Sequence, residues 1–288
     1  MSAPAAARID PATTLGAVRL TVSDLDGMTS FYERVLGLRV LERAGELVRL
    51  GPEGGSALVE LEGRSEAPPR PPRAAGLFHL AILVPSRPEL AASLRRVAEA
   101  GWGLTGASDH LVSEALYLRD PEGNGIEIYR DRSREEWRRT NGTLDMATLP
   151  LDLQGVLGEL DESRANGMPA GTRIGHVHLQ VSELGAAGTF YEDLVGFDVT
   201  VRTYPGALFL SAGGYHHHVG LNVWETDGGP VSPMGALGLA WYEVVLPGAD
   251  EIDGVADRLA DGGAEVSRRE EGVMATDPSG NHLLLRAG

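Results

Sequence analysis

The internal repeat of the chain constrains its fold more than any other feature of the sequence. Residues 20–40 align without gaps on residues 179–199, and both segments carry a Phe-Tyr-Glu run followed by a glycine. A weaker alignment places residues 84–101 on residues 246–263. Two pairs of matching segments along one chain are typical of a fold assembled from copies of one supersecondary unit.

Each repeat has the same order of predicted elements. An alternating apolar stretch, such as Val18 to Val22, predicts a strand. A helix follows it, opened by a serine or aspartate cap and closed near a glycine such as Gly37. Short alternating strands joined by glycine-rich turns complete the unit. We therefore predict an α+β protein of four βαβββ modules, at residues 15–63, 77–130, 174–225 and 237–288.

The segments outside the modules carry little repeat signal. We interpret residues 1–14 as a tail and the proline-rich residues 64–75 as an extended linker. Residues 131–173 are predicted to form a longer linker with short helices, one of which begins at a Ser-Arg-Glu-Glu capping box at residues 133–136. Residues 226–236, rich in glycine and proline, separate the last two modules.

Composition and charge exclude several classes of function. The 288-residue chain has a formal net charge of −16, which disfavours a nucleic-acid or anionic-membrane partner because both are polyanions. No stretch approaches the roughly 18 apolar residues of a membrane helix, and the N-terminus has no signal-peptide pattern. The chain has no cysteine, which removes thiolate ligands and cysteine nucleophiles. We expect a cytoplasmic protein that acts on a small molecule.

Two short motifs stand at fixed places in the modules. A first strand reads His-x-x-Leu-x-Val from residue 176, and a last strand completes Asp-Pro-x-Gly-x-x-Ile-Glu at residues 120–127. With the four modules around them, these motifs resemble the vicinal oxygen chelate superfamily, which includes glyoxalase I, fosfomycin-resistance proteins and type I extradiol dioxygenases. The resemblance covers nearly the whole chain and is closer to bacterial catechol 2,3-dioxygenases of four modules. It implies modules paired into two cup-shaped half-barrels, with a metal inside a cup.

The resemblance also implies the metal ligands, because ligands in this superfamily occupy the start of a first strand and a place on a last strand. His79 and His176 stand at first-strand positions and Glu127 at a last-strand position, in modules two and three. We therefore expect these two modules to share the metal-binding cup. Glu60 is then either solvent-facing or bound to a neighbour. The matching places in modules one and four hold residues unsuited to a metal: Ala17, Trp241 and Leu284.

Three more residues match functional positions of extradiol dioxygenases. His217 matches a histidine of the third module that acts as acid and base near dioxygen. Tyr117 and His110 match a tyrosine and a histidine that precede the final turn, although His110 needs a small insertion. The turn at residues 120–124 predicts a hairpin that sets Tyr117 opposite Glu127, so that both side chains face the metal.

Strand alternation predicts how the remaining histidines point. Successive side chains of a strand face opposite sides, so His217 would face one way and His216 and His218 the other. The same rule places His178 on the face of His176 and makes it a candidate pocket residue.

The ligand set indicates the chemistry. Two histidines and one carboxylate suit non-haem Fe(II), with Mn(II) as the alternative, and leave positions for substrate and dioxygen. The resemblance thus implies an extradiol dioxygenase that opens the ring of a catechol-like diol, with dioxygen as co-substrate, in a superfamily that often forms homo-oligomers. Two alternatives stay open. One is a glyoxalase-like metal-dependent isomerase or transferase, and the other is a resistance-type protein that binds a drug without metal.

Overall fold

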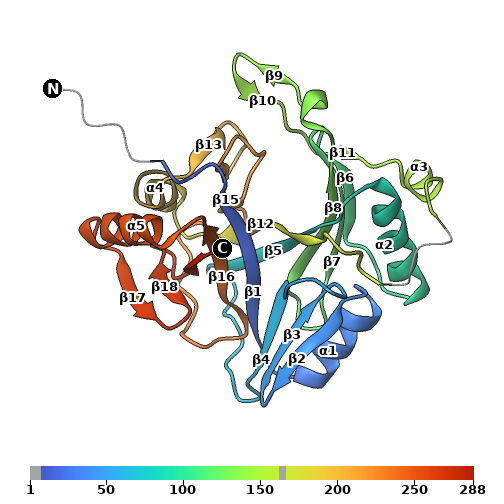
Figure 1. Ribbon diagram of the computed structural model, residues 1–288, viewed down its shortest axis with the longest axis horizontal. Helices are drawn as coiled ribbons and strands as arrows, with labels where there is room; N and C mark the ends of the chain where they lie inside the picture. Colours follow the sequence, from blue (N-terminus) through green and yellow to red (C-terminus); the bar gives the residue numbers. More distant parts are fainter. Residues whose placement is uncertain (1–7, 162–166) are drawn as a thin grey trace. The chain divides into compact units, whose positions relative to one another are not determined.

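The computed structural model describes residues 8–161 and 167–288. Part of the predicted tail, residues 1–7, and part of the predicted linker, residues 162–166, lie outside the described residues. Figure 1 shows the helices and strands in chain order. Within the described ranges, no helix is long and apolar enough to cross a membrane.

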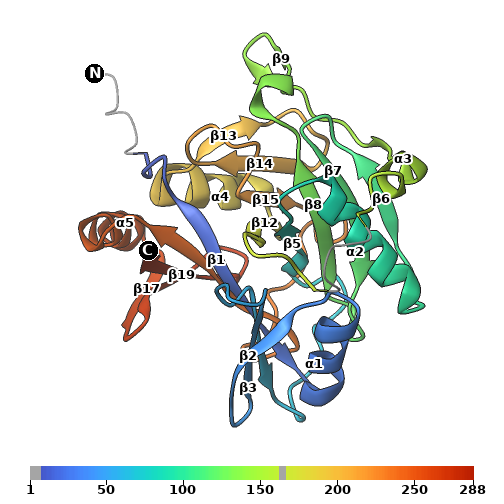
Figure 2. The same cartoon turned by 45° about the vertical axis from the view of Figure 1, so that its right-hand side comes forward.

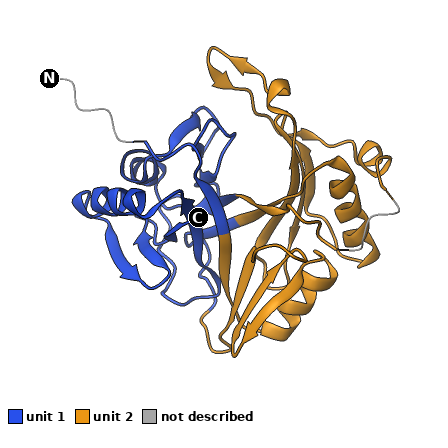
Figure 3. Cartoon of the chain, viewed as in Figure 1, with its two compact units in different colours: residues 1–16, 69–78, 176–288 blue, residues 17–68, 79–175 orange. Residues whose placement is uncertain are grey.

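The chain forms two compact units, which Figure 3 draws in different colours. Each unit combines two βαβββ modules that follow one another in the sequence. Unit 1 comprises residues 1–16, 69–78 and 176–288, and unit 2 comprises residues 17–68 and 79–175.

Modules one and two supply most of unit 2. Each has a strand, a helix and three further strands, as the repeat predicts. The elements of module one are β1 (Thr14–Val22), α1 (Leu25–Arg34), β2 (Arg39–Ala44), β3 (Leu47–Gly51) and β4 (Val59–Gly63). Those of module two are β5 (Gly76–Leu83), α2 (Arg87–Glu99), β6 (Gly106–Asp109), β7 (Ser113–Arg119) and β8 (Gly125–Asp131).

Modules three and four supply most of unit 1. The helix of module three continues as a π-helix, written η2. The elements of module three are β12 (Arg173–Gln180), α4 (Leu184–Thr189), η2 (Phe190–Val195), β13 (Asp198–Val201), β14 (Ala207–Ser211) and β15 (Val219–Asn222). Those of module four are β16 (Gly238–Leu246), α5 (Ala249–Asp261), β17 (Glu265–Arg269), β18 (Gly272–Thr276) and β19 (His282–Ala287).

All four modules have the same sheet order. The first strand pairs in parallel with the last, and the two middle strands follow by antiparallel pairing. In module one the order is β1-β4-β3-β2, and in module two it is β5-β8-β7-β6. Parallel neighbours need a long crossover connection, and in each module the helix supplies part of it; α1, for example, lies beside β2 and β3 (Figure 2). The predicted α+β fold of repeated βαβββ modules is confirmed.

The helix caps follow the sequence prediction only in part. In α1 the Asp24 carboxylate accepts from a backbone amide of the first turn, as expected. Ser86 stands at the N-cap of α2, but its side chain makes no capping hydrogen bond. The caps of α4 and α5 are Glu183 and Gly248, so the expectation of a serine or aspartate is wrong there. In α4 the longer Glu183 side chain caps the helix, because its carboxylate accepts from the backbone amides of Gly185 and Ala186.

The linker between modules two and three contains short elements. The predicted capping box at residues 133–136 is present, and it starts a single 3-10 turn rather than an α-helix. One strand of the linker, β11, adds to β6 at the edge of module two. The linker elements are η1 (Arg134–Glu136), β9 (Arg139–Thr140), β10 (Thr143–Leu144), β11 (Leu149–Pro150) and α3 (Leu153–Leu157).

A tyrosine–aspartate contact occurs once in each unit. In unit 2 the Tyr32 hydroxyl, on α1, donates to Asp120 of the turn before β8 over 3.2 Å. In unit 1 the Tyr191 hydroxyl donates to Asp277 over 3.1 Å. Both pairs are buried. The Asp-Pro-x-Gly-Asn turns thus bind the helix of the preceding module, which gives this motif a structural role that does not depend on a metal.

The burial of Asp120 predicts a pH-dependent stability. Burial raises the pKa of Asp120 to about 6, so its stabilising contribution is complete below about pH 4 and is lost as pH rises through about 6. Replacing Asp120 with asparagine removes the titration. We expect the difference in unfolding free energy between wild type and Asp120→Asn to change by about 2 kcal/mol between pH 4 and 7, with wild type losing stability.

Urea unfolding across this pH range measures the effect. Asp26, whose side chain is 82% exposed in its pair with Arg43, supplies the control. The difference between wild type and Asp26→Asn should stay nearly constant with pH. An equally flat difference for Asp120→Asn would contradict a raised pKa.

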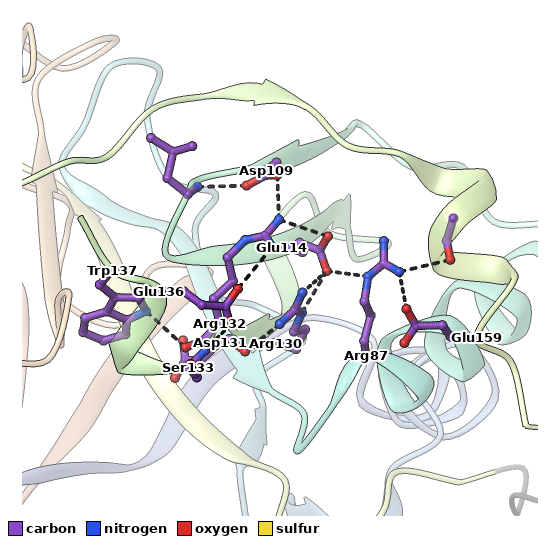
Figure 4. A network of polar contacts seen from close by, with 12 residues as sticks. Arg87, Asp109, Glu114, Arg130, Asp131, Arg132, Ser133, Glu136, Trp137 and Glu159 are labelled. Carbon is purple, nitrogen blue, oxygen red and sulfur yellow. Dashed lines mark hydrogen bonds and ion pairs between the residues drawn. The ribbon is translucent and has the colours of Figure 1, made fainter.

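A buried glutamate holds three arginines on the helix side of module two. Glu114, on β7, lies 2.8 Å from Arg87 and 2.7 Å from Arg130, and Arg132 approaches its other oxygen at 3.3 Å. Figure 4 shows the network, which Arg87 extends to Glu159 beyond α3. The glutamate therefore ties α2 and the linker to the sheet.

Glu114→Ala is expected to lower the unfolding free energy by about 3 kcal/mol, because it leaves three partly buried guanidinium groups without their shared anion. Glu136→Ala is the matched control. That side chain is 53% exposed and 3.9 Å from Arg132, so its loss should cost less than about 1 kcal/mol. Equal effects of the two substitutions in urea unfolding would show that burial does not set the strength of this network.

Candidate metal centre and acid–base groups

Three strands of module two bring a histidine, a glutamate and a tyrosine together. In the antiparallel pair β7–β8, Tyr117 lies directly opposite Glu127, so the register predicted from the hairpin is confirmed. His79, on β5, places its Nε2 atom 3.0 Å from Glu127 Oε2. The two side chains are only 5% and 2% exposed. The Tyr117 ring lies 5.7 Å from the His79 ring.

His110 extends this group through a hydrogen bond. Its Nε2 atom lies 2.6 Å from the Tyr117 hydroxyl, and its Nδ1 atom lies 2.7 Å from the Ala147 carbonyl oxygen. A carbonyl oxygen only accepts, so Nδ1 must carry a proton. In the neutral imidazole Nε2 is then the acceptor, and the Tyr117 hydroxyl donates to it. The pair forms a path by which a proton can leave the Tyr117 oxygen.

Module three brings together a second group of histidines. His176 and His178 lie on β12, two residues apart and thus on one face. The rings of His176 and His217 are 4.1 Å apart. His217 Nδ1 also lies 2.7 Å from His216 Nδ1. Because one of these nitrogens must accept the hydrogen bond, the two imidazoles share a proton between their Nδ1 atoms.

The predicted alternation of His216, His217 and His218 is wrong. β14 ends at Ser211 and β15 begins at Val219, so the three histidines lie in the connection between strands. Gly213 and Gly214, both with positive φ (59° and 68°), end the extended conformation before them. His216 therefore contacts His217 instead of facing away from it. His218 Nδ1 accepts from the Ala212 amide over 3.1 Å, which is a structural role.

The positions expected to bind no metal are engaged elsewhere. Glu60 is 5% exposed and binds Arg19 at 2.6 Å and Arg49 at 2.9 Å, so of the two expectations for it the neighbour-bound one is correct. His282, a histidine of module four outside the proposed ligand set, has its Nδ1 atom 3.0 Å from the Thr276 hydroxyl. Leu284 is a buried residue of β19 in module four.

The comparisons with known proteins show which family the chain belongs to. Residues 14–128 and 173–285 match the family described as the Glyoxalase/Bleomycin resistance protein/Dioxygenase superfamily, and the chain belongs to that superfamily. A relative within it, a catechol-2,3-dioxygenase of Bacillus subtilis (strain 168), is 44% identical over 278 residues, which cover 95% of this chain and 97% of the relative. Biphenyl-2,3-diol 1,2-dioxygenase 3 of Rhodococcus globerulus is 28% identical over 124 residues, which cover 39% of this chain and 60% of that protein.

Solved structures show the shared fold. A putative dioxygenase from Bacillus subtilis has a TM-score of 0.67 at 14% identity, and the match covers 98% of this chain and 86% of that one. Glyoxalase I from Zea mays has a TM-score of 0.57 at 17% identity, over 95% of this chain and 92% of that one. The resemblance expected from the sequence, to the superfamily and to catechol 2,3-dioxygenases within it, is confirmed.

Proposed function

We propose that this protein is an extradiol dioxygenase that opens the ring of a catechol-like diol beside its two hydroxyl groups. The observation that carries the proposal is the buried contact between His79 and Glu127 beside the Tyr117–His110 hydrogen bond. This arrangement places two potential metal ligands, His79 and Glu127, beside a tyrosine–histidine pair that can take a proton from a bound hydroxyl. Similarity over nearly the whole length of a relative named catechol-2,3-dioxygenase supports the same activity.

The proposed metal ligands are His79, Glu127 and His176. All three side chains are buried. Two imidazole nitrogens and one carboxylate oxygen suit ferrous iron, with Mn(II) as the alternative, and a cation there would stabilise the buried Glu127 carboxylate. When bound, the metal would hold the diol and dioxygen side by side and relay electrons between them.

The protein's own residues handle the protons of the diol. Tyr117 can accept a hydrogen bond from a diol hydroxyl with the oxygen lone pair that its donation to His110 leaves unused. The His217–His216 pair can take a proton from the second hydroxyl and later return it, because an imidazole nitrogen can both accept and donate a proton. We propose these roles for His217, Tyr117 and His110 from the resemblance to extradiol dioxygenases, and the contacts within each unit support them.

The donor set disfavours the alternative activities. A glyoxalase-type site would need a second carboxylate from module three, and β15 reads Val-Gly-Leu-Asn at the corresponding place. Burying the Glu127 carboxylate beside His79 costs free energy, and drug binding without a metal gives that carboxylate no role.

Oxygen uptake tests the proposal. The protein is loaded anaerobically with Fe(II), Mn(II), Zn(II) or Ni(II), mixed with a panel of catechols, and followed with an oxygen electrode and by the visible absorbance of the ring-opened semialdehyde. We expect one dioxygen consumed per diol opened, with Fe(II) or Mn(II) only. Absence of uptake with every diol and metal, or turnover of an α-ketoaldehyde–thiol adduct with Zn(II) or Ni(II), would overturn it.

The cellular setting stays a prediction from the sequence. We propose a cytoplasmic location, a small aromatic diol as the partner, and no nucleic-acid or membrane partner for a chain of net charge −16. Sedimentation of the purified protein measures whether it forms the homo-oligomer that the superfamily suggests.

A further inference from the structure

Five aromatic side chains of unit 1 form a continuous wall that starts at His217. The Phe209 ring lies 4.9 Å from the His217 ring and 5.7 Å from the His178 ring. Beyond His178 stand Phe78, at 5.2 Å, and Trp224, at 5.4 Å. Tyr204 lies against Phe209 at 5.8 Å and Trp224 at 6.2 Å. We call Phe78, His178, Tyr204, Phe209 and Trp224 the aromatic wall.

The inner part of the wall lies on one face of the sheet. Phe209, Gly220 and His178 stand opposite one another on β14, β15 and β12, so they share one face. Leu208, the neighbour of Phe209, points the other way toward α4, where it lies against Gly188. A Cβ atom on Gly220 would meet the His178 ring at 3.0 Å. The glycine is therefore what allows the imidazole to lie flat across β15.

The outer end of the wall is exposed and fixed in orientation. Trp224 is 45% exposed, although a large aromatic ring is usually buried. Its Nε1 atom donates to the Pro205 carbonyl over 2.9 Å, which holds the indole in place. Gly206, with φ of 69°, makes room for the ring, because a Cβ there would lie 3.0 Å from the indole. A half-exposed ring held in this way is preorganised to cover an apolar ligand.

We propose that the aromatic wall binds an apolar substituent on the ring of the diol, so that the substrates are alkyl- or aryl-substituted catechols rather than catechol itself. The inference rests on the proposed function, because the wall begins at the acid–base residue His217 and ends at the half-exposed Trp224. A substituent lying along the wall would cover the exposed ring of Trp224 and extend toward the buried rings of Phe209 and His178, while the diol stays beside His217.

Steady-state kinetics with catechol, 3-propylcatechol and 4-propylcatechol tests the inference. We expect wild type to show a kcat/KM at least about tenfold higher for one propylcatechol than for catechol, the discrimination that apolar pockets achieve per added group. Trp224→Ala should lower that ratio by about tenfold. Met234→Ala is the matched control, because Met234 is 92% exposed and lies outside the wall. It should leave the ratio unchanged.

A binding measurement tests whether the substituent contacts Trp224 independently of the rate of turnover. Anaerobic titration of the metal-loaded protein with the preferred propylcatechol should quench tryptophan fluorescence, and Trp224→Phe should remove most of that quenching. Turnover of all three diols at equal kcat/KM, or an equal loss of kcat/KM for all three in Trp224→Ala, would overturn the inference and leave the dioxygenase activity standing. Absence of oxygen uptake with any of them would instead overturn the proposed function.

Discussion

Replacing His217 with alanine is expected to lower kcat by about 10²- to 10⁴-fold, the range of a lost general acid–base group, while the protein keeps its metal. His217 is 6% exposed, and its ring lies 4.1 Å from His176 and shares a hydrogen bond with His216. The substitution removes the imidazole that exchanges a proton with the diol. It leaves the three proposed ligands in place. Oxygen uptake at saturating diol, with metal content measured on the same sample, gives the result.

His282→Ala supplies the matched control for this variant. His282 is a half-buried histidine of module four that contacts Thr276, so its loss should change kcat by less than about threefold. If His217→Ala retained wild-type kcat, the acid–base assignment would be wrong. If it lost its metal together with activity, His217 would act by supporting His176.

Replacing Glu127 with glutamine is expected to abolish metal binding and turnover together. The substitution keeps the volume of the side chain and removes the only charge in the proposed ligand set. Loss of a residue that merely supports a ligand costs about 10- to 100-fold in metal affinity, so loss of the anionic ligand should weaken binding by more than about 100-fold. Metal content after dialysis and oxygen uptake at fixed Fe(II) measure the two effects.

Glu60→Gln is the control matched in residue type and place. Glu60 lies on the last strand of module one and is 5% exposed, but it binds Arg19 and Arg49. That variant should lose stability and keep its metal. Full metal occupancy in Glu127→Gln, or equal metal loss in both variants, would remove Glu127 from the ligand set.

The parts of the fold that the sequence predicts are those that the repeat or a turn determines. Two alignments define the module, because the same order of strand, helix and strands recurs. The tight turn at residues 120–124 determines the register of β7 on β8, and with it the placement of Tyr117 opposite Glu127. Both predictions concern residues that are close in sequence, and repeat matching and turn geometry act over that distance.

The parts that were not predictable depend on a backbone change or on distant partners. The contact of His216 with His217 follows from Gly213 and Gly214, which end the strand that the alternation rule assumed. The three arginines around Glu114 come from α2, from β8 and from the residue that follows β8, and charge patterning does not identify such partners. The aromatic wall had a signal that was overlooked. Phe209 and Trp224 are large aromatic residues close in sequence to the histidine run.

The central claim is that His79, Glu127 and His176 bind one metal ion. The most direct measurement is a crystal structure of the Fe(II)-loaded protein, with anomalous differences collected on both sides of the iron absorption edge. We expect one strong anomalous peak within coordination distance of all three side chains. A peak bound by His79 and Glu127 without His176, or a peak at the surface only, would contradict the claim.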